Sequence, residues 1–169
     1  MKGLPRLWHR IIPLHMILLC SCLLLGAWLR LYALQADSLW FDEILTAMRS
    51  REDLGWLLWG SPPVRFRPVS YVITHFFLLL FGESDFIVRL PSIMEGILGV
   101  AVMYKVGAML YGQREGMIGA LLLALSPFHI CYSQEARFYA LMLLLSLLTV
   151  LFLWKALLES GSERSKWFW

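Results

Sequence analysis

The sequence predicts an all-α membrane protein with about four transmembrane helices, and with interfacial helices in a long first outer loop. Of its 169 residues, 59% are hydrophobic, and the mean hydropathy is +0.66. Only 16% are charged, whereas soluble domains average about 25%. Several apolar runs approach the roughly 20 residues that a helix needs to cross a bilayer. The net charge of +3 is small and its basic residues are scattered, so we expect no nucleic acid partner.

The first apolar run follows a basic segment that contains Lys2, Arg6 and Arg10 but no acidic residue. The positive-inside rule places such a segment in the cytoplasm. We interpret the run as a signal anchor, because it is longer than a signal-peptide core and no clear cleavage site follows it.

Pro91 suits the first turn of a later span. The expected spans are residues 11–31, 90–111, 116–131 and 138–158.

The expected outer loop, residues 32–89, should contain short helices. Asp37 and Ser38 can cap one helix, and a second should begin near Asp53. The apolar run 69–81 is short for a span, and acidic residues follow it. We expect 69–81 to be interfacial or re-entrant on the outer side, because a fifth span would move the basic C-terminal tail outside.

With four spans, the polar motifs gather on the outer face. A carboxylate there can be a general base, a metal ligand or a proton relay, and the planar fork of arginine suits a phosphate. The alternative for Asp42 and Glu43 is an ordinary acidic pair at a helix N-terminus. Carboxylates, arginines and an apolar wall together fit a phosphate donor that is linked to a lipid.

Four motifs in order resemble the C-type membrane glycosyltransferases, in particular the bacterial branch related to protein O-mannosyltransferases and the lipid A aminoarabinose transferase. The motifs are Leu-Trp-Phe-Asp-Glu at 39–43, Arg-Pro-Val-Ser-Tyr at 67–71, Gly-Glu-Ser-Asp-Phe-Ile-Val-Arg-Leu-Pro-Ser at 82–92, and Ser-Pro-Phe-His-Ile-Cys-Tyr-Ser-Gln-Glu-Ala-Arg-Phe-Tyr-Ala-Leu at 126–141. The resemblance implies sugar transfer from a polyprenyl-phosphate donor at the outer face of the cell inner (plasma) membrane. It also implies a membrane lipid environment and a glycan, lipid or protein acceptor.

The resemblance makes Asp42 the catalytic base, and we expect Glu43 to orient the acceptor or Asp42. The expected contacts to the donor phosphate are Arg67, Arg89 and Arg137. The expected residues of the substrate cavity are Tyr71, Glu135 and Tyr139. We expect no dedicated metal site, although an Asp-Glu pair could hold a divalent ion with a third ligand.

Two departures from the family pattern stand out. Phe66 occupies a position where many members have histidine, and Arg67 could replace that histidine as a phosphate contact. Glu95 lies in a stretch that is usually small and apolar. Members of the family are several times longer, so we expect this chain to be the N-terminal part of such an enzyme, inactive on its own. The alternatives are a transporter fragment, for which Glu95 is the candidate mid-span charge, and a non-catalytic membrane subunit.

Overall fold

The computed structural model describes residues 14–60 and 68–160, and within these residues every regular element is a helix. The elements in chain order are α1 (Leu14–Leu31), α2 (Phe41–Ser50), α3 (Leu54–Trp59), α5 (Pro68–Phe81), α6 (Asp85–Leu110), α7 (Gln113–Leu125), α8 (Pro127–Gln134) and α9 (Tyr139–Ser160). The chain is therefore an all-α membrane protein, as the sequence predicts.

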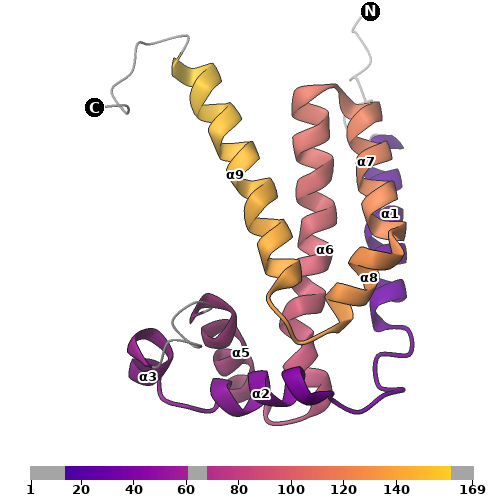
Figure 1. The fold of residues 1–169 in the computed structure, drawn as a ribbon. Helices are drawn as coiled ribbons and strands as arrows, with labels where there is room; N and C mark the ends of the chain where they lie inside the picture. The colour runs from indigo at the N-terminus through magenta and orange to yellow at the C-terminus, as the bar shows by residue number, and fades with distance from the viewer. Residues whose placement is uncertain (1–13, 61–67, 161–169) are drawn as a thin grey trace, which may run out of the picture.

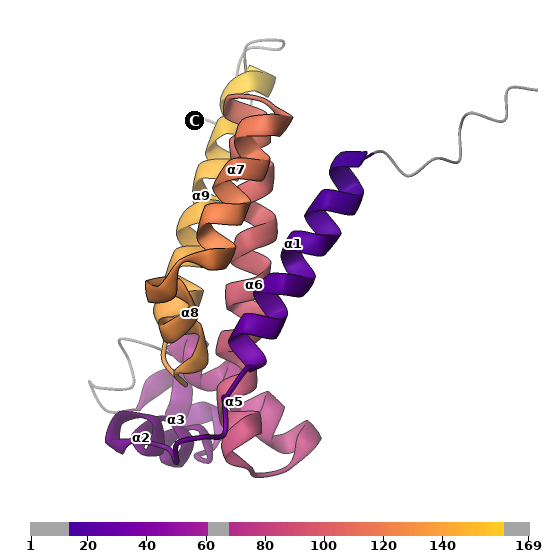
Figure 2. The same cartoon turned by 90° about the vertical axis from the view of Figure 1, so that its right-hand side faces the viewer.

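The long helices form a bundle around α6, which contacts α1, α7 and α9 (Figure 1). The short helices α2, α3 and α5 gather at one end of this bundle, which we call the loop end. A view from the side shows the same arrangement (Figure 2). The start of α1 and the end of α9 lie at the opposite end. The outer-loop motifs and the segment between α8 and α9 therefore meet at the loop end.

Three helices, α1, α6 and α9, are long and apolar enough to cross a membrane. The pair α7 and α8 supplies a fourth candidate span if it is counted as one broken helix. The apolar helix α5 has 14 residues and lies with α2 and α3 at the loop end (Figure 1). This placement favours the prediction that residues 69–81 do not cross the membrane.

The structure differs from the continuous span expected over residues 116–131. The helix begins at Gln113, breaks at Ser126 and continues as α8 with a bend of 58°. Pro127 has no backbone N–H and favours the first position of a new helix. The Ser126 side chain accepts a hydrogen bond from the His129 N–H at 3.4 Å and caps that new helix.

Two helix starts also differ from the expected ones. Helix α6 begins at Asp85, where the Ser84 side chain caps it by accepting from the Ile87 N–H, so Pro91 lies inside the helix and not in its first turn. Helix α2 is not capped by Asp37 or Ser38, because Trp40 occupies the N-cap position. The structure does show Asp53 capping α3 through the Trp56 N–H at 2.8 Å.

Close packing joins the helices of the bundle at two levels. A buried cluster of Cys22, Val100, Tyr104, Ala120 and Ala124 joins α1, α6 and α7. Near the opposite end, a Cβ on Gly107 would lie 2.7 Å from the Cα of Gly116. Since Cβ atoms do not approach backbone so closely, these glycines allow α6 and α7 to touch directly. This packing positions the ends of the helices that build the site.

Candidate functional site

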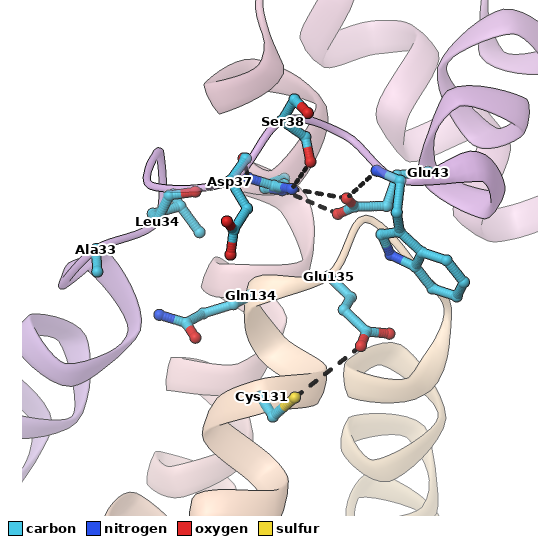
Figure 3. Close-up of a pocket in the computed structure, with 10 residues that line it drawn as sticks. Ala33, Leu34, Asp37, Ser38, Glu43, Cys131, Gln134 and Glu135 are labelled. Carbon is cyan, nitrogen blue, oxygen red and sulfur yellow. Dashed lines mark hydrogen bonds and ion pairs between the residues drawn. The ribbon is translucent and has the colours of Figure 1, made fainter.

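A pocket of about 400 Å³ opens at the loop end, between the start of α2, the first turns of α6 and the end of α8 (Figure 3). Its wall combines one indole ring with several polar groups. The lining residues are Ala33, Leu34, Asp37, Ser38, Trp40, Glu43, Arg89, Cys131, Gln134 and Glu135. Pockets of this size are typical of small-molecule sites.

Glu43 is completely buried at the back of this pocket, and both of its carboxylate oxygens are used. Oε1 accepts from Arg89 Nε at 2.9 Å and from the backbone N–H of Ala136 at 2.8 Å. Oε2 accepts from Arg89 Nη2 at 2.7 Å and from the Trp40 N–H at 3.3 Å. Glu43 therefore joins α2, α6 and the segment between α8 and α9, which are far apart in the sequence.

The donors of Arg89 are used by the protein itself. Besides Glu43, Nη1 donates to the carbonyls of Leu34 at 2.6 Å and Asp37 at 3.1 Å, and Nη2 donates to the Ser38 carbonyl at 3.3 Å. The side chain is 8% exposed. These contacts fix the chain between α1 and α2. Binding of a donor phosphate by Arg89 stays a prediction, and this arrangement leaves it little free capacity.

Asp42 and Arg137 form a second ion pair, with 3.1 Å between Oδ2 and Nη2. The Asp42 side chain is 33% exposed, in contrast to its buried neighbour Glu43. The Arg137 guanidinium lies 5.9 Å from the centre of the Tyr139 ring, within cation–π range. Within residues 14–60 and 68–160, its Nε atom is buried and has no hydrogen-bond partner. Of the two ion pairs, Asp42–Arg137 is therefore the more exposed one. The Nε–H group of its arginine can still donate a hydrogen bond.

Glu135 lies in the pocket wall, and its carboxylate is close to the Cys131 thiol, with 4.0 Å between Oε1 and Sγ (Figure 3). Burial raises the pKa of Glu135, and the negative charges of Glu43 and Asp42 act in the same direction, opposed by Arg137 and Arg89. Glu135 therefore binds its proton more tightly than an exposed glutamate does.

The structure brings most of the predicted site residues to one place. Asp42, Glu43, Arg89, Glu135, Arg137 and Tyr139 all lie at the loop end, around the pocket or the neighbouring ion pair. Tyr71 also lies at the loop end, on α5, but it does not line the pocket: it is buried beside Leu57, and its hydroxyl accepts from Arg49 Nη1 at 3.1 Å. Arg67 lies outside the described residues, so its role stays a prediction.

A divalent metal ion does not fit the side chains that the structure describes. Across residues 14–60 and 68–160, no group of three His, Cys, Asp or Glu side chains lies close enough together to hold one. Both oxygens of Glu43 already accept from N–H donors.

Sequence reasoning missed three polar residues beside the site, namely Arg30, His129 and Gln134. Gln134 donates its amide to carbonyls at the end of α1, including that of Tyr32 at 2.9 Å. Arg30 and His129 form a buried pair between α1 and α8. The available signal was an arginine inside an apolar helix, because such residues are costly in a membrane and usually have a specific partner.

Comparison with known proteins gives one match. A family model described as dolichyl-phosphate-mannose-protein mannosyltransferase matches residues 62–169, well over half of the chain. The matched region includes Arg89, Glu135, Arg137 and Tyr139, and it begins after Asp42 and Glu43. No curated protein and no solved structure matches the chain.

Proposed function

The chain belongs to the dolichyl-phosphate-mannose-protein mannosyltransferase family, and we propose that it transfers a sugar from a polyprenyl phosphate to an acceptor hydroxyl, with Asp42 as the general base. The family transfers glycosyl groups from polyprenyl-phosphate sugars. One observation carries the finer assignment: Asp42, unlike its buried neighbour Glu43, is partly exposed, and it is paired with an arginine that can bind a phosphate.

The charges around the pocket favour different ligands in two places. The charge of Arg89 is already balanced by Glu43, so the pocket wall offers mainly the carboxylates of Asp37 and Glu135. These groups accept hydrogen bonds from hydroxyls and repel a phosphate. The ring of Trp40 adds an apolar face. The pocket therefore suits a sugar ring or a hydroxyl-bearing acceptor, and the phosphate belongs beside Arg137.

The proposed reaction is a single displacement. The acceptor oxygen attacks the anomeric carbon and forms the new glycosidic bond, while the bond from that carbon to the phosphate oxygen breaks with its electron pair. Asp42 takes the proton from the acceptor hydroxyl. Arg137 stabilises the negative charge that develops on the departing lipid phosphate. In-line attack inverts the anomeric centre.

In this mechanism Arg137 exchanges one anion for another. In the free protein it pairs with Asp42 at 3.1 Å. A donor phosphate competes for the same guanidinium, because arginine binds phosphate oxygens through two parallel N–H groups. When Arg137 turns to the phosphate, the Asp42 carboxylate is released from its ion pair and is free to accept the proton of the acceptor hydroxyl. Donor binding thus prepares the base.

Of the two roles expected for Glu43, orienting the acceptor or orienting Asp42, its contacts favour the second. Its contacts to Arg89, Ala136 and Trp40 fix the start of α2, so it holds Asp42 in place. Arg67 remains a candidate second contact to the phosphate. The basic N-terminal segment supports placing the loop end, and with it the site, on the outer face of the inner membrane.

Sugar transfer by the purified protein in proteoliposomes tests the proposal. The donors are polyprenyl-phosphate sugars, with nucleotide sugars as the contrasting donor class. We expect transfer from the polyprenyl phosphates only, with inversion, and loss of transfer in Asp42→Asn. Asp85→Asn is the matched control, because Asp85 is an exposed aspartate at the same end of the bundle. If the wild-type protein binds the donor lipid without transferring sugar, the chain is a non-catalytic subunit and the proposal is wrong.

A further inference from the structure

Arg30 is the largest fully buried side chain of the described residues, and it lies in the last turn of the apolar helix α1. A charge in such a position is stable only if its donors find partners. Nη1 donates to the carbonyls of Gly26 at 2.8 Å and Ala124 at 3.3 Å, and Nη2 reaches the Leu123 carbonyl at 3.5 Å. Two of these three carbonyls belong to the last turn of α7.

The Leu123 carbonyl loses its helical donor at the helix break. In a continuous helix it would accept from the backbone N–H four residues later. That residue is Pro127, which has no N–H. Arg30 therefore supplies, from another helix, a donor that the α7–α8 break removes. In a membrane no water is present to satisfy such a carbonyl.

His129 receives the other contact of the same guanidinium. Its Nδ1 atom lies 2.6 Å from Arg30 Nη2. Arginine can only donate, so Nδ1 accepts in this contact. His129 is the third residue of α8. Arg30 thus holds both sides of the break, the end of α7 and the start of α8.

The far end of α8 is held by the same helices. The Gln134 amide donates to the Arg30 carbonyl at 3.2 Å. Ser133 packs so closely on α6 that a Cβ on Gly96 would lie 2.3 Å from its Oγ and 3.1 Å from Arg30 Nε. Directly beyond Gln134, the Ala136 N–H contacts Glu43 and Arg137 pairs with Asp42. The orientation of α8 therefore determines where these last two contacts form.

We propose that Arg30 is a positioning residue for sugar transfer: it stabilises the break between α7 and α8, and so places Arg137 and the Ala136 N–H against Asp42 and Glu43. This inference rests on the proposed function for its catalytic consequence, but the geometric part stands without it. Arg30 itself touches neither the pocket nor the Asp42–Arg137 pair.

Distance measurement tests the geometric part. Spin labels replace the exposed side chains of Met48 on α2 and Phe128 on α8, in a cysteine-free protein in lipid nanodiscs. We expect Arg30→Met to broaden and shift the distance distribution measured by electron–electron resonance. Gly96→Ala should also broaden and shift this distance distribution, but without removing a charge. It therefore replaces Arg30→Met as the test variant if Arg30→Met does not fold. Gly99→Ala is the matched control, because its Cβ would lie 3.8 Å from His129 Nε2, an ordinary contact.

Activity and rescue test the mechanism. A displacement on the order of 1 Å can reduce turnover about 100-fold, so we expect losses of that order in Arg30→Met and Gly96→Ala, and near-normal turnover in Gly99→Ala. Pro127→Ala restores an N–H for the Leu123 carbonyl. Added to Arg30→Met, it should recover thermal stability but not turnover, because the helix then straightens.

A distance distribution in Arg30→Met and Gly96→Ala that overlays that of Gly99→Ala would overturn the inference. Recovery of turnover by Pro127→Ala would also overturn it, since the bend would then not matter. If the distances change as expected but the wild-type protein transfers no sugar, the proposed function fails and the positioning role remains.

Discussion

Replacing Glu43 by glutamine should destabilise the protein far more than replacing an exposed glutamate of another ion pair. Glu43 and Arg89 are 1% and 8% exposed, and the pair is closed by contacts of 2.9 and 2.7 Å. Glutamine keeps the shape and one acceptor oxygen, but it leaves the charge of Arg89 buried without a counter-charge. Breaking a buried pair in this way typically costs about 3–5 kcal/mol.

The chain offers a matched control. Glu83 pairs with Arg51 at 2.8 Å, but these side chains are 58% and 53% exposed. Exposed pairs contribute about 0–1 kcal/mol, so Glu83→Gln should be nearly neutral. The predicted difference between the two Glu→Gln variants is at least about 2 kcal/mol, which is more than a tenfold change in the folding equilibrium.

Reversible unfolding by SDS in mixed micelles, followed by circular dichroism and tryptophan fluorescence, measures both variants. Adding Arg89→Met to Glu43→Gln should recover part of the loss, because the uncompensated charge is removed with it. Equal unfolding free energies for Glu43→Gln and Glu83→Gln would refute the assignment of Glu43 as the residue that holds the site together.

Two further predictions concern pH and topology. The pKa of Glu135 is raised in the folded protein. Its contribution to stability is therefore complete below the ordinary carboxyl pKa and is lost as the pH rises through the raised value. The free energy of unfolding, measured from pH 4 upward, should show this loss in the wild type and a smaller loss in Glu135→Gln. Single cysteines at Glu83, at the loop end, and at Glu115, in the first turn of α7 at the opposite end of the bundle, should differ in intact cells. An impermeant maleimide should label the first and not the second, and the reverse pattern would contradict an outward-facing site.

The sequence predicts the fold well because its strongest signals are long apolar runs. The ends of α1 and α9 fall within a few residues of the expected limits. The broken span was not foreseen, because α7 and α8 together are as apolar as one continuous span. The Ser126-Pro127 pair carried the missing information, since a proline inside a helix removes one backbone donor.

The structure brings six of the predicted site residues together, but the sequence did not show how they pair. Sequence order places Asp42 and Glu43 side by side, and only the fold shows that one of them is buried and the other partly exposed. Arg89 was expected to meet a phosphate, whereas its donors close on Glu43 and on nearby carbonyls. No local pattern reveals which arginine finds a carboxylate of its own, because these partners are 46 residues apart.

The most direct test of the mechanism separates donor binding from turnover in two variants. Binding of a fluorescent polyprenyl phosphate and single-turnover sugar transfer are measured on the same nanodisc samples. Asp42→Asn should bind the lipid phosphate at least as tightly as the wild type, because Arg137 is released from its partner, yet it should transfer no sugar. Arg137→Gln should bind it about tenfold or more weakly, since a charge-assisted hydrogen bond contributes about 1.5–3 kcal/mol. Near-normal transfer by Asp42→Asn, or unchanged lipid binding by Arg137→Gln, would contradict the account.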